Sequence, residues 1–355
     1  MIITGLWFPG DRPTNAWGPP STDVLASPPV ARVFSGIQPT GEFHLGNYLG
    51  AIRRWVGAQH EDDAIHCIVD LHALTVPQDP AELRAKIIEA TQVLVAAGLD
   101  PEVTTLFVQS QVAEHAELAW VMECTAAFGE LRRMTQFKEK SDQADFVSAG
   151  LFTYPALQAA DILLYDTEKV PVGDDQRQHL ELARDLAVRF NSRYGETFVV
   201  PEHAIPPVAA RVLDLQHPDR KMSKSVDSPL GTVLVLDAPD TIRRKFRRAV
   251  TDSETDVRYD PAERPGVANL LSILAAATDD RPEALADNYV QYGPLKADAA
   301  EAVIELLRPL QKRFAELAAD PAETQRILAT GAAKARAMAG PKMTLVRERL
   351  GLPPP

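Results

Sequence analysis

The sequence predicts an α/β fold in which a parallel β-sheet is followed by a helical region. Residues 33–37, 64–70 and 104–109 form short runs that favour strands, and the second is continuously apolar, as in strands buried on both faces. Helical periodicity separates the runs, and this alternation is typical of βαβ units. Beyond Pro239 the pattern indicates helices joined by turns.

Local signals mark the first elements. The first strand ends in the turn Gln38–Gly41. Asp79 followed by Pro80 has the form of an N-cap with proline at the first helical position, which predicts an amphipathic helix to about Gly98. The other expected elements are helices at about 114–137, 153–165, 176–193, 239–250, 265–278, 282–291, 295–319 and 321–350, and strands around 198–201 and 210–215.

Length and composition restrict the class of protein. The 355 residues suffice for about two domains, and 45% are hydrophobic. Lys+Arg 37 against Asp+Glu 49 gives a net charge of −12, which argues against coating nucleic acid through bulk positive charge. No apolar run approaches the roughly 20 residues of a membrane span, and the N-terminus lacks a secretory pattern. Cys67 and Cys124 match no disulfide or metal framework. We therefore expect a cytoplasmic protein without a membrane partner.

Residues 1–30 differ from the rest of the chain. Six prolines crowd this segment, and no hydrophobic period is sustained in it. Because proline removes backbone donors and fixes φ, we expect an irregular N-terminal arm.

The usual nucleotide-binding fingerprints, G-x-G-x-x-G and the Walker loop, are absent from the sequence. The segment Ser35–Gly50 offers another phosphate site, because it joins the first strand to the first helix, where open α/β sheets bind ligands. His44 and Asn47 lie one helical turn apart, so both can face one phosphate group. Gly46 lacks a Cβ and lets a ring lie on the backbone. A glycine-rich turn with a surface histidine is the alternative.

A second cationic signal is Lys221-Met222-Ser223-Lys224-Ser225, in a turn-rich context. Two lysines three residues apart, with small hydroxyl residues, form a loop that can close over a polyphosphate and neutralise charge growing in the transition state. Taken alone, this pentapeptide has a solvated surface loop as its default interpretation.

Together, His-Leu-Gly-Asn at 44–47 and Lys-Met-Ser-Lys-Ser at 221–225 resemble the H-I-G-H and K-M-S-K-S signatures of class I aminoacyl-tRNA synthetases. Further stretches are similar to the bacterial tryptophanyl-tRNA synthetases, at residues 34–41, 68–75, 134–140, 154–165 and 170–176. The resemblance runs from about Arg32 to the C-terminus. It implies a Rossmann-like catalytic domain at 31–225, with a helical substrate and dimer-interface region at about 105–165, and a helical anticodon-binding domain at 226–355.

The resemblance implies a two-step reaction: ATP converts L-tryptophan to tryptophanyl-adenylate and pyrophosphate, and tryptophan then passes to the 3′ end of tRNA(Trp). The first step needs alignment and neutralisation of phosphate charge, with Mg²⁺ carried by the nucleotide and no metal site on the protein. The implied catalytic residues are Lys221, Lys224 and Lys140, which neutralise pyrophosphate, with His44 and Asn47. The residues implied to bind ATP are Gln38, Pro39, Thr40, Gly46, Asn47, Gly173, Asp174, Asp175, Val212, Lys221, Met222, Ser223, Lys224 and Ser225.

Asp161 lies in an apolar helical stretch, where an unpaired carboxylate is costly. From the residues alone, a helix-packing aspartate bound to backbone or to arginine is the leading interpretation. The resemblance implies instead that Asp161 accepts the indole N–H, an interaction that rejects side chains lacking a polar hydrogen. The other implied tryptophan-site residues are Phe34, Val170 and Val172 as walls, Tyr154 and Gln176 at the polar end, and His72, for which a structural role remains open. Gln158 stands where many family members have methionine.

The run Arg243–Arg248 is the strongest local positive charge, with Phe246 predicted to turn inward. It is either a contact for the tRNA backbone or a solvated face paired with Asp237 and Asp240. The resemblance also implies a homodimer.

Other functions remain open at this point. A tyrosyl-tRNA synthetase shares both signatures, although the stretches at 158–162 and 172–176 follow the tryptophan enzymes. A nucleotidyltransferase shares the first signature but is generally about half this length. A synthetase-like paralogue without catalysis is the last alternative, and the intact Lys221, Lys224 and Asp161 argue against it.

Overall fold

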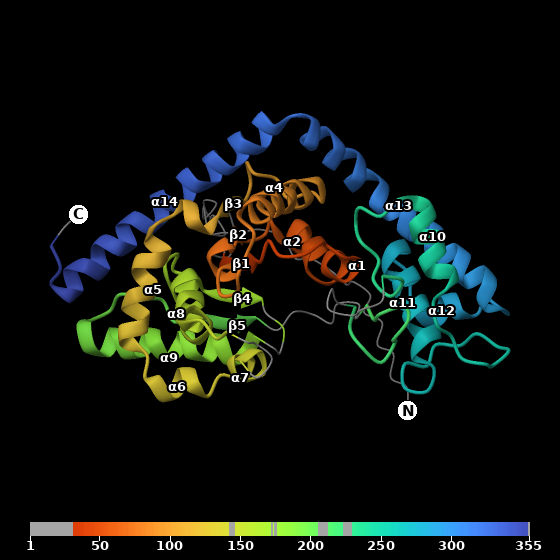
Figure 1. Ribbon diagram of the computed structural model, residues 1–355, viewed down its shortest axis with the longest axis horizontal. Helices are drawn as coiled ribbons and strands as arrows, with labels where there is room; N and C mark the ends of the chain where they lie inside the picture. The colour runs from red at the N-terminus through yellow and green to blue at the C-terminus, as the bar shows by residue number, and fades with distance from the viewer. Residues whose placement is uncertain are drawn as a thin grey trace, which may run out of the picture. The chain divides into compact units, whose positions relative to one another are not determined.

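Five strands form one parallel sheet in the computed structural model, which describes residues 31–141, 146–171, 173, 176–204, 212–222 and 229–353. The expected N-terminal arm, residues 1–30, lies outside these ranges. The strand order is β3-β2-β1-β4-β5 (Figure 1). The predicted parallel α/β sheet is confirmed. The strands are β1 (Arg32–Ile37), β2 (Asp63–Ile68), β3 (Thr105–Val108), β4 (Lys169–Pro171) and β5 (Glu202–Ala204).

Helices surround the sheet and make up most of the chain after Pro239, as the sequence predicts. None of the described helices is long and apolar enough to cross a membrane. In chain order the helical elements are α1 (Leu45–Asn47), the π-helical turn η1 (Tyr48–Ile52), α2 (Arg53–Ala58), α3 (Asp70–Ala73), α4 (Pro80–Ala96), the 3-10 turn η2 (Gln109–Gln111), α5 (Glu114–Thr125), α6 (Phe128–Arg132), α7 (Thr135–Ser141), α8 (Ala149–Leu163), α9 (Arg177–Tyr194), α10 (Pro239–Arg247), α11 (Pro265–Thr278), α12 (Pro282–Ala286), α13 (Tyr292–Ala319) and α14 (Pro321–Leu350).

The sheet is buried on both faces by two hydrophobic clusters. Alternate residues of β3 divide between them: Leu106 and Val108 join the cluster of α4, α11 and α13, and Phe107 joins the cluster of α5, α8 and α9. This alternation follows from the two-residue period of a strand. Because both faces are covered, the strand ends are where such a sheet can bind ligands.

Three expected elements are wrong. Of the strand expected around 210–215, the described residues form only an isolated bridge between Leu213 and Lys221. The helix expected over 114–137 divides into α5, α6 and α7, because Glu130 caps the start of α6 by accepting from the Ala127 N–H and is held there by Arg189. The strand expected at 198–201 is absent, and β5 begins at Glu202. The side chain of Asn191 bonds both the N–H and the C=O of Phe198, so these groups are not available to a neighbouring strand.

The last helix, α14, lies across the outer edge of β3 (Figure 1). Leu328 packs in the first cluster and Ala335 in the second, so the helix passes from one face of the sheet to the other. Gly331 lies between them with its Cα against the Leu106 carbonyl oxygen. The helix α14 thus covers the unpaired edge of β3, so that another chain cannot pair with this edge.

Buried His66 makes folding stability depend on pH. Its Nδ1 donates to Thr104 Oγ1 over 2.8 Å, and burial lowers its pKa from 6.5 to about 4. Below pH 6.5 the unfolded chain binds a proton that the folded chain excludes, so stability falls as the pH drops toward 4, by roughly 3 kcal/mol over the whole range. Denaturant unfolding between pH 7.5 and 5 should show this slope, and His66→Asn, which keeps a donor, should flatten it. Equal slopes for both proteins would contradict the assignment.

Candidate active site

A cavity of about 580 Å³ lies at the carboxyl ends of β1 and β4. The order of the parallel strands reverses between β1 and β4: β2 and β3 lie on one side of β1, whereas β4 and β5 lie on its other side. Open α/β sheets bind ligands at such a switch point. The cavity brings together eight of the predicted site residues: Phe34, Gln38, Asn47, His72, Tyr154, Asp161, Val170 and Gln176.

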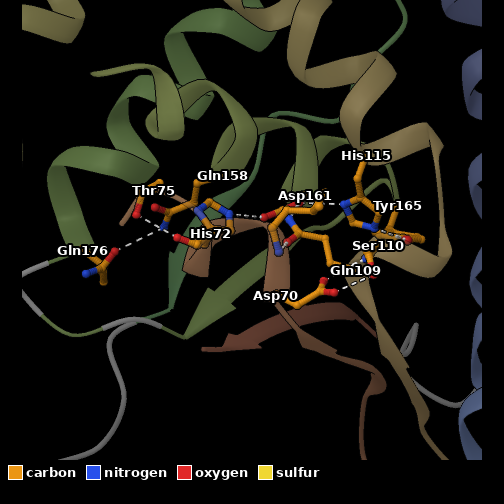
Figure 2. A network of polar contacts seen from close by, with 11 residues as sticks. Asp70, His72, Thr75, Gln109, Ser110, His115, Gln158, Asp161, Tyr165 and Gln176 are labelled. Carbon is orange, nitrogen blue, oxygen red and sulfur yellow. Dashed lines mark hydrogen bonds and ion pairs between the residues drawn. The ribbon is translucent and has the colours of Figure 1, made fainter. Parts of the chain in front are cut away.

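Asp161 on α8 is the central polar group of this cavity, although it is only 1% exposed. Among the described residues, its Oδ1 accepts from Gln109 Nε2 and His115 Nδ1, both at 2.6 Å, and its Oδ2 accepts from His72 Nε2 at 2.8 Å (Figure 2). Burial by itself raises the pKa of Asp161, but the hydrogen bonds from His115 and His72 outweigh it and hold the pKa well below its usual range. The cavity therefore presents an ionised carboxylate to a ligand.

The loop behind Asp161 is fixed by reciprocal bonds between the ends of β2 and β3. Gln109 Oε1 accepts from the Leu71 N–H, which orients the amide so that Nε2 faces Asp161. Asp70 accepts from the backbone N–H and the hydroxyl of Ser110 (Figure 2). The elements α3 and η2 thus hold two of the donors to Asp161 in place.

The walls of the cavity near Asp161 are mostly apolar. Phe34 comes from β1, Val170 from β4 and Ile162 from α8, and Phe34 stacks on Tyr165 with ring centroids 5.9 Å apart. His72 presents its ring from α3, edge-on to Tyr154. Val172, which the sequence placed in the same wall, lies outside the described residues. A flat aromatic ligand with one polar hydrogen fits this combination of walls and carboxylate.

At the other side of the cavity, polar side chains converge from α7, α8 and α9. The Tyr154 hydroxyl lies 2.7 Å from His179 Nε2 and 3.3 Å from Gln136 Oε1. Burial raises the pKa of Tyr154 to about 12, so the hydroxyl stays protonated at neutral pH. Gln158 donates to Gln176 Oε1 over 3.2 Å and so orients the amide of Gln176 (Figure 2). These groups suit the charged end of an amino acid.

The first signature lies at the start of α1, beside the cavity. His44 Nδ1 accepts from the Asn47 N–H, and Asn47 Oδ1 accepts from the His44 N–H, so the two residues form a capping box. A Cβ on Gly46 would lie 3.0 Å from His44 Nδ1. Asn47 and Gln38 line the cavity, while Pro39 is buried and Thr40 half-buried in the turn between them.

The second signature begins on a short antiparallel pair. Leu213 is bridged to Lys221, and the Met222 N–H donates to the Val212 carbonyl over 3.0 Å. Met222 is buried against Gly46, and a Cβ added to Gly46 would lie 3.7 Å from Met222 Cβ. Lys221 is exposed. The two signatures, far apart in the sequence, are therefore in contact.

Several predicted site residues cannot be placed. Val172, Asp174, Asp175, Ser223, Lys224 and Ser225 lie outside the described residues, as does the side chain of Lys140. Gly173 is described and exposed, and its carbonyl accepts from the Gln176 N–H over 2.9 Å.

The basic run on α10 divides into paired and exposed cations. Lys245 is buried and bonds Asp237 Oδ2 at 2.6 Å, and Arg243 pairs with Asp240 and Glu301. Phe246 is fully buried, as predicted. The exposed guanidinium groups of the run belong to Arg244, Arg247 and Arg248.

The sequence did not identify Gln109 and His115 as partners of Asp161. Gln109 directly follows β3, and a polar residue at the end of a buried parallel strand is a signal that could have identified it. His115 carries no comparable signal, because only the packing of α5 on α8 brings it to Asp161.

Comparison with known proteins agrees with this geometry. The family model for class I tRNA synthetases (W and Y) matches residues 28–308. The parallel sheet, with its surrounding helices, is thus that of a class I tRNA synthetase.

Individual relatives narrow this class. Tryptophan–tRNA ligase 1 of Streptomyces coelicolor is 57% identical over 331 residues, which cover 92% of this chain and 98% of the relative. The structure of tryptophanyl-tRNA synthetase from Mycoplasma pneumoniae superposes with a TM-score of 0.84 at 34% identity, covering 91% and 98% of the two chains. The structure of tryptophanyl-tRNA synthetase from Campylobacter jejuni complexed with ADP and tryptophan superposes with a TM-score of 0.80 at 35% identity. The match covers 90% of this chain and 100% of the Campylobacter jejuni chain. The chain belongs to the bacterial tryptophan–tRNA ligase family.

Proposed function

We infer that this chain is a tryptophan–tRNA ligase, which activates L-tryptophan with ATP and transfers it to the 3′ end of tRNA(Trp). The observation that carries this function is the buried carboxylate of Asp161, which is held by three hydrogen bonds and lines the cavity at the switch point of the sheet. In the first step a tryptophan carboxylate oxygen attacks the α-phosphorus of ATP, and the bond to pyrophosphate breaks. In the second step a terminal ribose hydroxyl of tRNA loses its proton and attacks the carbonyl carbon of the tryptophanyl-adenylate anhydride, the bond from that carbon to the AMP oxygen breaks, and AMP leaves.

Tryptophan binding is assigned to the part of the cavity around Asp161. The indole N–H donates to Asp161 Oδ2, and the ring lies between the side chains of Phe34 and Val170. The amino acid's charged end is oriented by Tyr154 and Gln176, whose positions 2.7 Å from His179 and 3.2 Å from Gln158 support this role. His72 contributes both a wall and a bond to Asp161, which supports a binding role beside its structural one.

ATP binding is assigned to the two signatures. Gln38, Asn47 and the start of α1 receive the nucleotide, and Lys221, Lys224 and Lys140 neutralise the pyrophosphate as it leaves. The contact of Met222 with Gly46 supports this assignment, because the described start of the second signature, Lys221-Met222, lies against the first helix. Mg²⁺ enters with ATP, since phosphate oxygens are its preferred ligands. Residues 31–225 perform this chemistry, and the helices of 226–355 bind the anticodon region of tRNA.

We further propose a homodimer that acts in the cytoplasm. Large apolar side chains are exposed in the region expected to form the dimer interface: Trp120 is 67% exposed, Phe128 68% and Phe146 73%. Burying them against a second copy is favourable by roughly 25 cal/mol per Å² of apolar surface. Light scattering of the purified protein measures whether its mass is that of one chain or two.

Pyrophosphate exchange tests the proposed function. With ATP and labelled pyrophosphate, we expect tryptophan to support exchange and tyrosine to be inactive, and tRNA(Trp) to be charged when it is added. Exchange with tyrosine alone would identify the sister enzyme. Folded protein that exchanges with neither amino acid would be a paralogue without catalysis.

A further inference from the structure

The donors to Asp161 lie on two sides of its carboxylate. His72 lines the cavity as Asp161 does, whereas Gln109 and His115 are not among the described lining residues. The two rear donors both bond Oδ1, and His72 bonds Oδ2 (Figure 2). A carboxylate oxygen accepts about two hydrogen bonds. Within the described residues, Oδ1 is therefore filled from behind, and Oδ2 keeps one acceptor site for a ligand.

His115 is itself held in one orientation. It is fully buried, and its Nε2 lies 2.7 Å from the Tyr165 hydroxyl. Burial raises the pKa of Tyr165 far above its usual range, so the hydroxyl keeps its proton. A neutral imidazole has one donor and one acceptor, so when Tyr165 donates to Nε2, Nδ1 carries the proton and donates to Asp161.

Tyr165 is fixed by aromatic neighbours. Its ring stacks on Phe34 with centroids 5.9 Å apart and meets Phe107 edge-on at 5.8 Å. Phe34 also lines the cavity. The chain of contacts from Tyr165 through His115 to Asp161 thus runs behind the tryptophan site and is anchored in the sheet.

We propose that His115, oriented by Tyr165, is a positioning residue for tryptophan selection that occupies Oδ1 of Asp161 and so directs Oδ2 at the indole N–H. This inference rests on the proposed binding of indole by Asp161. Without the Nδ1 donor, the carboxylate loses one of its two rear bonds, and its plane is no longer fixed toward the cavity. With one hydrogen bond fewer to oppose it, burial raises the pKa of the Asp161 carboxyl and so disfavours its charged form.

The experiment compares two variants, each of which keeps a polar group at the position of one of the two imidazole nitrogens. His115→Asn retains an N–H near the Nδ1 position, and His115→Gln retains a polar group near Nε2 but loses the donor to Asp161. Each protein is assayed by pyrophosphate exchange with tryptophan and with β-(3-benzothienyl)alanine, an analogue in which sulfur replaces the indole N–H. The ratio of the two kcat/KM values isolates the bond to the N–H, because the analogue keeps the shape of the substrate.

In His115→Gln we expect kcat/KM for tryptophan to fall roughly 10- to 100-fold, the effect of one hydrogen bond to a charged group. The value for the analogue should stay within about threefold, since it donates nothing to Asp161. His115→Asn should retain most of the wild-type ratio. Equal losses for both substrates would overturn the inference and leave His115 with a structural role only.

The wild-type ratio separates this inference from the function on which it rests. A wild-type enzyme that does not distinguish tryptophan from the analogue would contradict the Asp161 assignment itself. Should His115→Gln fail to fold, Tyr165→Phe decides, because it keeps the ring and removes only the hydroxyl that orients His115. A tryptophan-to-analogue ratio unchanged in Tyr165→Phe would then overturn the inference.

Discussion

Asp161→Asn is expected to lower kcat/KM for tryptophan by roughly 100-fold or more, while KM for ATP stays unchanged. The asparagine amide has the shape of the carboxylate but offers an N–H₂ group in place of one oxygen. Since Gln109, His115 and His72 all donate to Asp161, at least one donor in the variant faces another donor. The indole N–H loses its acceptor in the same way. We therefore expect tryptophan to bind more weakly, because the hydrogen bond between its indole N–H and residue 161 is lost.

Pyrophosphate exchange with tryptophan and phenylalanine measures this effect. Phenylalanine lacks the N–H, so its slow activation should change little, and the preference for tryptophan should collapse. Asp252→Asn is the matched control, because Asp252 is a carboxylate paired with Arg264 and Tyr292 and is not among the described residues that line the cavity. A preference for tryptophan that persists in Asp161→Asn would refute the indole assignment.

Gly331→Ala is expected to destabilise the protein by about 3 kcal/mol, although alanine is the better helix former. A Cβ at this position would approach the Leu106 carbonyl oxygen closer than any real Cβ contact. That oxygen belongs to the backbone of β3 and cannot rotate away, so α14 must move off the sheet. The strain then spreads to the two hydrophobic clusters that α14 joins.

Gly57→Ala in α2 provides the control, because Gly57 is exposed and no proline follows it. Nothing lies within 4 Å of a Cβ at Gly57, so this substitution should stabilise the protein by about 0.5–1 kcal/mol through helix propensity alone. Thermal unfolding of the two variants should shift in opposite directions. Parallel shifts would show that α14 does not press on β3.

The parts of the structure that sequence analysis predicted are those that local signals determine. Asp79 and Pro80 predict the start of α4, and Asp79 indeed accepts from the N–H groups of Ala81 and Glu82. The apolar run at 64–70 predicts β2. By contrast, β4 has only three residues, too few for a period, and it forms because Val33 and Glu202 flank it in the sheet.

The candidate site was predicted unevenly for the same reason. Asp161 can be identified from the sequence, because a carboxylate in an apolar helix needs hydrogen-bond partners. The partners themselves cannot be identified from the sequence. They come from α3, η2 and α5, and only tertiary packing brings these elements to one carboxylate. Sequence reasoning expected backbone or arginine as partners, whereas the structure supplies two histidines and a glutamine.

The position of α14 across β3 has a consequence for the order in which the protein is made. Arg336 of α14 bonds the carbonyl of Gln111, the last residue of η2, and 225 residues separate the two. A ribosome adds about 5–20 residues per second, so β3 and η2 wait roughly 10–45 s for their covering helix. During this time the edge of β3 is open to pairing with other nascent chains. Arg347 of α14 also pairs with Glu117 of α5, which carries His115. The cavity around Asp161 therefore receives this outer support only after α14 has been synthesised.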